Sequence, residues 1–198
     1  MQTFNFRLDA EALPKGAPLI TFNYEDSEFI RFAKAVKKAI DGGEFNNLTD
    51  YAPVWKYFRC NNRKGLFLFG GCGCGKTFLA KYVYGQLLFN RGIAPTVIDA
   101  IDMADHIKEL EDKGRHYYIL DDVGTEAPRQ EYGNTIDPFV DLVYRAEERG
   151  LLLIITTNYN TEQFIERYGQ RVYSRIKQLC ECVNLGKVPD YRLTGKKS

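Results

Sequence analysis

Mostly apolar runs recur along the chain and are separated by segments with helical spacing. Four such runs lie at residues 66–69, 96–99, 117–120 and 151–156, and residues 179–185 are expected to form a last strand. Apolar strands that alternate with helices are typical of a parallel sheet buried between two helical layers. We therefore predict an α/β fold, a three-layer α/β/α sandwich around a five-stranded parallel sheet.

Apolar residues three and four apart, together with glycine and proline signals, predict the helices. Residues 46–62 are ambiguous and are expected to contain a second helix around Trp55 and a loop. Residues 1–20 are expected to form an irregular arm, and residues 193–198 a polar tail. The predicted helices cover 27–40, ended by Gly42; 76 to about 90, ended by Gly92; about 103–111; the segment from Asp137-Pro138 to Gly150; 160–168; and 172–179.

The composition is that of a globular protein with nearly balanced charge. The 198 residues are 44% hydrophobic and 27% charged, with 27 Lys and Arg against 26 Asp and Glu. Because affinity for nucleic acid grows with the number of phosphates neutralised, any DNA contact requires a local patch or several subunits together. No stretch approaches the roughly 20 apolar residues that cross a bilayer. The five cysteines and the absence of a signal peptide favour the reducing cytoplasm, with no disulfide framework and no membrane contact.

Residues 70–77, Gly-Gly-Cys-Gly-Cys-Gly-Lys-Thr, match the Walker A pattern G-x-x-x-x-G-K-[ST] at every fixed position. They lie between a predicted strand and a predicted helix, which makes an accidental glycine-rich turn a poor alternative. Lys76 is expected to reach the β- and γ-phosphates of ATP, and Thr77 to offer its hydroxyl to Mg²⁺. The predicted nucleotide contacts are Gly70, Gly71, Cys72, Gly73, Cys74, Gly75, Lys76, Thr77 and Phe78.

The apolar run 117–120 ends in two acids, the arrangement of a Walker B motif. Asp121 is expected to hold Mg²⁺, which prefers carboxylate and water oxygens. Asp122 is expected to polarise the attacking water, although it is one methylene shorter than the glutamate found there in many related sites. Glu126 is a second candidate for that role. The alternative is a strand that ends in a solvated acidic turn.

The run 151–156 ends in the polar sequence Thr156-Thr157-Asn158. If this strand neighbours the first one, Asn158 is expected to lie over the γ-phosphate and position the water. A simple turn at the end of the strand is the alternative.

Arg171 and Arg175 are four residues apart and share one face of a predicted helix. An arginine presented to the γ-phosphate of a neighbouring subunit would stabilise charge in the transition state. The spacing alone favours surface arginines paired with local acids such as Glu162 or Glu166.

The cysteine pairs and the basic face of the first predicted helix are more typical of structural roles than of binding sites. Neither Cys72 with Cys74 nor Cys180 with Cys182 has the C-x₂₋₄-C spacing of a zinc site. Oxidation of Cys72 or Cys74 would crowd the phosphate loop, which makes redox sensitivity a hypothesis. The basic face of the helix at 27–40 is more typical of a solvated surface than of a DNA site.

Together these residues resemble the AAA+ ATPases of the DnaC-like helicase-loader group and the neighbouring IstB-like transposition ATPases. The resemblance covers roughly residues 20–192. Its specific marks are the segments 65–70 leading into the Walker A loop, 120–126, 132–134, 156–158, Tyr168-Gly169 with Arg171, Ser174-Arg175, and Asp190-Tyr191-Arg192.

The resemblance implies a role for several residues. Asn158 would be the first sensor, and Arg175 the arginine finger with Arg171 in reserve. Arg192 would be the second-sensor arginine, and residues 20–22 would form a linker that packs near the adenine. The ATPase domain would span residues 21–192 and lack the helical lid domain of many AAA+ proteins.

By this resemblance the chain is expected to hydrolyse ATP with Mg²⁺ and to form an ATP-dependent oligomer on DNA, with single-stranded DNA as the expected form. It would load or regulate a replicative helicase or a transposase. Because Asp122 replaces a glutamate, the alternative is a nucleotide-gated adaptor with little intrinsic turnover. A small-molecule kinase is less well supported, since the sequence shows no lid arginines.

Overall fold

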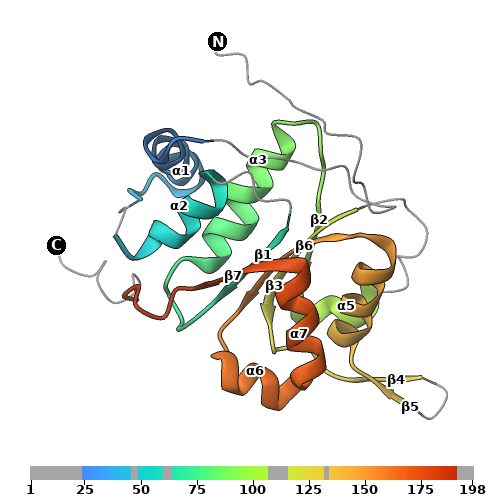
Figure 1. Ribbon diagram of the computed structural model, residues 1–198. Helices are drawn as coiled ribbons and strands as arrows, with labels where there is room; N and C mark the ends of the chain where they lie inside the picture. Colours follow the sequence, from blue (N-terminus) through green and yellow to red (C-terminus); the bar gives the residue numbers. More distant parts are fainter. Residues whose placement is uncertain (1–23, 46–48, 60–63, 107–115, 132–133, 191–198) are drawn as a thin grey trace.

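The computed structural model describes residues 24–45, 49–59, 64–106, 116–131 and 134–190. At its centre is a five-stranded sheet in the order β2-β3-β6-β1-β7, with every neighbouring pair parallel (Figure 1). The predicted three-layer fold and its five-stranded parallel sheet are thus confirmed. The strands are β1 (Gly65–Phe69), β2 (Thr96–Asp99), β3 (Tyr117–Val123), β6 (Leu152–Thr157) and β7 (Cys180–Asn184).

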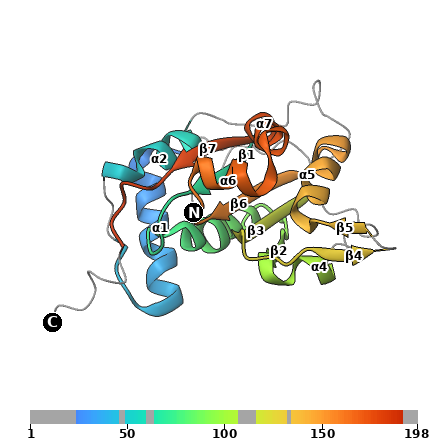
Figure 2. The same cartoon turned by 90° about the horizontal axis from the view of Figure 1, so that it is seen from below.

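Alternate residues of the central strands face opposite helical layers. Leu66 and Leu68 of β1 belong to one buried cluster, whereas Phe67 belongs to the other. Figures 1 and 2 show the helices divided between the two sides of the sheet. The first cluster contains residues of α1 (Asp26–Asp41), α2 (Ala52–Arg59) and α3 (Gly85–Phe89), and the second contains residues of α4 (Met103–His106), α5 (Pro138–Arg149), α6 (Thr161–Tyr168) and α7 (Gln170–Leu179). Burial on both faces explains why the strands are apolar throughout.

Local signals set the helix ends as predicted. Gly42 follows α1 in the left-handed region, with φ of 71°, and its N–H donates to the carbonyl of Lys38. Asp137 caps α5 by accepting from two backbone N–H groups of the first turn, with Pro138 as the first helical residue. Asn160 caps α6 through a capping box: its side chain accepts from the backbone N–H of Gln163, and its own N–H donates to the side chain of Gln163.

The helix after the phosphate loop differs from the regular α-helix that the sequence predicts. Residues Phe78–Tyr84 form a π-helical segment, η3, before α3 begins at Gly85. The N–H of Gly85 accordingly donates to the carbonyl of Ala80, five residues earlier. Such wide turns are rare and are often found at functional sites. This segment carries Lys81, which reaches the site described below.

The second helix expected around Trp55 is observed as α2, whereas two other features were not predicted. The ambiguous region contains a 3₁₀ turn, η2 (Thr49–Tyr51), that leads directly into α2. Between β3 and α5 the chain forms an antiparallel hairpin of β4 (Arg129–Glu131) and β5 (Asn134–Ile136), which projects away from the main sheet (Figure 1).

Several predictions fall on residues outside the described ranges. They are the irregular arm at 1–20, the linker at 20–22, the end of the helix predicted at 103–111, Arg192 and the polar tail at 193–198. The described part of that helix is α4, preceded by a 3₁₀ turn, η4 (Ala100–Asp102). No helix within the described ranges combines the length and the apolar character needed to cross a membrane.

Candidate nucleotide-binding site

The phosphate loop, residues 70–77, connects the carboxyl end of β1 to the helical segment that begins at Lys76. Gly73 and Gly75 have φ of 73° and 84°, in the left-handed region that favours glycine. A Cβ atom on Gly73 would lie 1.7 Å from a carboxylate oxygen of Asp190, and one on Gly75 would lie 2.8 Å from the hydroxyl of Tyr51. The positive φ at both positions therefore favours glycine, and a side chain there would also have to displace Asp190 or Tyr51.

Tyr51 supports the phosphate loop through a buried hydrogen bond. Its hydroxyl donates to the carbonyl of Cys74 at 2.9 Å, and its side chain is completely buried. Sequence reasoning missed this contact because Tyr51 lies in the region whose structure was ambiguous. The hydrogen bond ties the loop to the helical layer formed by α1 and α2.

The ammonium group of Lys76 lies inside the loop. Its Nζ donates to the carbonyl oxygens of Gly70 at 2.9 Å and Gly71 at 2.7 Å, and to Oδ1 of Asn158 at 2.8 Å. Lys76 is buried, with 7% of its surface exposed. The structure thus brings the loop lysine into contact with the predicted first sensor.

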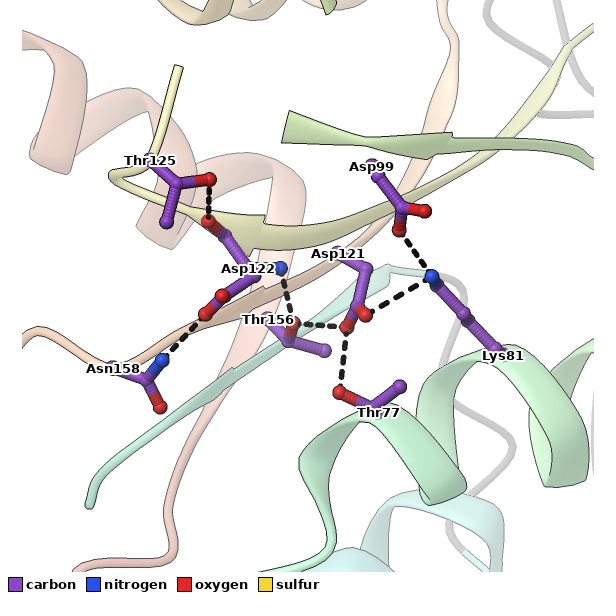
Figure 3. A network of polar contacts seen from close by, with 8 residues as sticks. All are labelled: Thr77, Lys81, Asp99, Asp121, Asp122, Thr125, Thr156 and Asn158. Carbon is purple, nitrogen blue, oxygen red and sulfur yellow. Dashed lines mark hydrogen bonds and ion pairs between the residues drawn. The ribbon is translucent and has the colours of Figure 1, made fainter. Parts of the chain in front are cut away.

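The hydroxyl of Thr77 and the carboxylate of Asp121 face each other (Figure 3). Oδ1 of Asp121 accepts from Thr77 Oγ1 at 3.1 Å and from Thr156 Oγ1 at 2.6 Å. A hydroxyl and a carboxylate are the hard oxygen ligands that suit Mg²⁺. The two residues predicted as metal ligands therefore form a donor set that fits this ion.

A β-bulge in β3 turns the carboxylate of Asp122 toward the same side of the sheet as that of Asp121. Leu120 is paired with Ile155 and Val123 with Thr157, so β3 has one more residue than β6 between these pairs. The extra residue lies at Asp122, whose φ is 59°. Successive side chains of a regular strand point to opposite faces, so without the bulge the two acids would diverge.

Asn158 connects the second acid to the phosphate loop. Its Nδ2 donates to Oδ1 of Asp122 at 2.5 Å (Figure 3). Its Oδ1 accepts from Nζ of Lys76. The backbone N–H of Asp122 donates to Thr156 Oγ1 at 2.8 Å, which holds the bulge in place. Residues from the carboxyl ends of β3 and β6 are thus joined to the loop after β1.

These groups line one cleft of about 540 Å³, within the size range of small-molecule sites. Of the predicted loop residues, Gly70, Gly71 and Cys74 do not line the cleft. Residues of α1 and Tyr82 of η3 add a wall that was not predicted. The lining residues are Lys37, Ile40, Asp41, Cys72, Gly73, Gly75, Lys76, Thr77, Phe78, Tyr82, Asp121, Asp122, Thr156 and Asn158.

Glu126, the second candidate for activating water, is directed elsewhere. It is 4% exposed, and its carboxylate accepts from the hydroxyl of Tyr168 and from the N–H of Gly124. Burial, followed by the hydrogen bond to Glu126, raises the pKa of Tyr168 well above its ordinary value, so the hydroxyl stays protonated. Glu126 therefore anchors α6, and Asp122 is the candidate for activating water that lines the cleft.

The arginines of α7 lie outside the cleft of their own chain. Nε of Arg175 pairs with Oε2 of Glu147 at 2.6 Å, and its guanidinium lies 4.5 Å from the ring centre of Tyr144. The partner acid is on α5 rather than on α6, where Glu162 and Glu166 were considered. Arg171 is exposed on the same helix. Whether either arginine acts on a neighbouring subunit stays a prediction.

Sequence reasoning also missed Lys81 and Asp99. Lys81 forms an ion pair with Oδ2 of Asp121 at 3.1 Å and a second one with Asp99. Two signals were available: Lys81 follows Thr77 by one helical turn, and Asp99 ends a predicted strand beside the one that carries Asp121.

Comparison of the sequence with protein-family models gave no match, and comparison with curated proteins gave none either. Solved structures do match the fold. A DnaC helicase loader has a TM-score of 0.53 and 23% identity over 73% of this chain and 94% of that chain. AMPPCP-bound DnaA from Aquifex aeolicus has a TM-score of 0.53 and 18% identity over 71% of this chain and 48% of that chain.

A DNA replication initiation factor matches similarly, with a TM-score of 0.51 and 18% identity over 71% of this chain and 47% of that chain. This chain thus corresponds to about half the length of DnaA and to nearly all of the matched DnaC structure. The IstB-like part of the resemblance stays a prediction. The chain therefore shares the α/β core fold of the matched DnaC and DnaA structures.

Proposed function

We propose that this protein binds ATP with Mg²⁺ in the cleft between the phosphate loop and the carboxyl ends of β3 and β6, and hydrolyses it. The main support is the arrangement of five side chains that are joined by hydrogen bonds. Thr77 and Asp121 are in contact, and Asn158 joins Lys76 to Asp122. Phosphate-binding, metal-binding and water-activating groups are thus combined in one cleft.

Each group has a distinct task in this proposal. The loop amides and Lys76 hold the phosphates, and Thr77 and Asp121 hold Mg²⁺, which when bound neutralises phosphate charge. Asp122 orients the attacking water and accepts its proton. Asn158 keeps the carboxylate of Asp122 at a fixed place relative to the loop. Arg192 would contact nucleotide in its own subunit.

Arg175 completes the site of a neighbouring subunit in an ATP-dependent oligomer. Its position outside its own cleft supports action in trans, where a guanidinium stabilises transition-state charge. The ion pair with Glu147 would have to open or rearrange for this contact. Arg171, exposed on the same helix, is the reserve candidate.

The oligomer assembles on single-stranded DNA in the cytoplasm and loads or regulates a replicative helicase or a transposase. The fold shared with a helicase loader and with DnaA supports a role in DNA replication. The net charge of +1 supports DNA binding by several subunits together rather than by one.

A nucleotide-gated adaptor with negligible turnover is the second candidate. It is favoured by Asp122, which is shorter than glutamate and whose carboxylate is held by Asn158. ATP would then switch the protein between partners without rapid hydrolysis.

Steady-state phosphate release with and without single-stranded DNA separates the two candidates. Stimulated release supports the ATPase, whereas tight ATP binding without release supports the adaptor. Arg175→Ala should retain ATP binding and lose turnover. Mixing it with Lys76→Ala should restore part of the activity, because an oligomer then pairs an intact loop with an intact Arg175. An Arg175→Ala protein with full turnover contradicts the finger assignment.

A further inference from the structure

Both oxygens of the Asp121 carboxylate have partners. Oδ1 accepts from Thr77 and Thr156, while Oδ2 pairs with Nζ of Lys81 at 3.1 Å. The same ammonium group pairs with Asp99 (Figure 3). A lysine therefore lies directly against the carboxylate to which the metal-binding role is assigned.

The fold brings these groups together from three elements. Thr77 and Lys81 are four residues apart on one helical segment, so one rigid element contacts both oxygens of Asp121. Asp99, at the end of β2, is the direct neighbour of Asp121 in the sheet register. Contacts to both oxygens from a single helix fix the rotation of the carboxylate.

Charge and burial indicate how strongly these groups interact. The side chains of Lys81 and Asp121 are only 18% and 7% exposed, whereas that of Asp99 is 53% exposed. The ammonium group of Lys81 pairs with the carboxylates of both Asp99 and Asp121, and carboxylate partners favour the charged form of an amine. Lys81 is therefore positively charged at neutral pH.

A fixed positive charge beside a metal ligand has two opposite consequences. It holds the carboxylate in one orientation, which favours an ordered site. It also repels any divalent cation that approaches Asp121, and this repulsion is strong where water is partly excluded. The phosphates of a nucleotide would bring the negative charge that offsets it.

We propose that Lys81 is a positioning residue of the metal site: it keeps Oδ1 of Asp121 directed at Thr77 and prevents the site from binding a divalent cation before nucleotide arrives. This inference rests on the proposed nucleotide site. A lysine that only stabilises the edge strand β2 would affect folding and leave metal affinity unchanged.

Manganese binding to the nucleotide-free protein, measured by electron paramagnetic resonance, tests this role directly. Lys81→Met removes the charge and keeps the apolar stem of the side chain. It should bind Mn²⁺ at least about tenfold more tightly than wild type, because the Coulomb repulsion is lost. Lys34→Met, which removes an exposed lysine of α1, should leave Mn²⁺ affinity as in wild type.

Nucleotide affinity and turnover provide the second readout. Affinity for ATP in EDTA should be the same in wild type and Lys81→Met, whereas kcat with saturating Mg²⁺ should fall about tenfold with little change in KM. Lys81→Arg, which retains the charge, should keep Mn²⁺ binding weak. If Lys81→Met does not fold, Lys81→Gln takes its place with the same expected gain in Mn²⁺ affinity.

Unchanged Mn²⁺ affinity in the neutral variant that folds overturns the proposal. Failure of the wild type to bind ATP would instead refute the proposed function, because the Mn²⁺ comparison requires no nucleotide.

Discussion

Because Asp122 has a left-handed backbone conformation, we expect glycine at this position to stabilise the protein more than alanine does. At an ordinary position Ala is favoured over Gly by about 0.5–1 kcal/mol, because Gly loses more conformational entropy on folding. With φ of 59°, a side chain at position 122 pays a left-handed penalty of about 1–2 kcal/mol that Gly avoids. Asp122→Gly should therefore be more stable than Asp122→Ala by about 0.5–1 kcal/mol.

The comparison isolates the backbone because both variants lose the carboxylate and its hydrogen bond from Asn158. Urea unfolding, followed by circular dichroism, measures the free energy of unfolding of each. Lys34→Ala and Lys34→Gly are the matched control pair in the middle of α1, where Ala should be favoured by about 1 kcal/mol. Neither Asp122 variant should hydrolyse ATP.

The reasoning is refuted if the Ala variant is more stable than the Gly variant at position 122, as it should be at position 34. If Asp122→Ala is more stable than Asp122→Gly, residue 122 is not in the left-handed region. The bulge would then fail to explain how two consecutive acids face one cleft.

Three other predictions concern the loop and its neighbours. Tyr51→Phe removes the buried hydroxyl that donates to the carbonyl of Cys74, so the free energy of unfolding should fall by about 1–2 kcal/mol in urea unfolding. ATP binding should also become weaker. Unchanged stability and ATP affinity would contradict the role of Tyr51 in supporting the loop. Cys72 is exposed, whereas Cys180 is buried and its pKa is raised. N-ethylmaleimide, followed by peptide mapping, should therefore modify Cys72 before Cys180, and ATP should protect Cys72; modification of Cys180 before Cys72 would oppose this. Because the pKa of Lys81 is raised on folding, its stabilising contribution is complete below the unfolded pKa of about 10.4 and is lost as pH rises through the folded value. The stability difference between wild type and Lys81→Met should thus stay constant from about pH 6 to 9 and shrink above about pH 10.5, and a difference that already varies between pH 6 and 9 would contradict it.

The parts of the structure that sequence predicts well are those set by local pattern and complete burial. Leu66 to Phe69 contact helices on both sides, so they must be apolar, and the strand is visible at once. The phosphate loop is equally visible, since its glycines are required at fixed places. Helix ends at Gly42 and Asp137 follow from cap chemistry that is local to each end.

The parts that escape prediction depend on contacts between distant segments. The bulge at Asp122 leaves no trace in composition, because aspartate is tolerated both in a strand end and in the left-handed region. Arg175 finds Glu147 only because α5 and α7 pack together, and Lys81 meets Asp99 across an edge of the sheet. The π-helical turn at Phe78–Tyr84 likewise has no clear local signal.

Calorimetric titration of the purified protein with ATP and Mg²⁺, beside the Lys76→Ala variant, tests the nucleotide site most directly. We expect the wild type to bind one ATP per chain and Lys76→Ala to lose most of that affinity, since its ammonium lies inside the loop. If both proteins bind equally, or if neither binds, the loop is not a phosphate site.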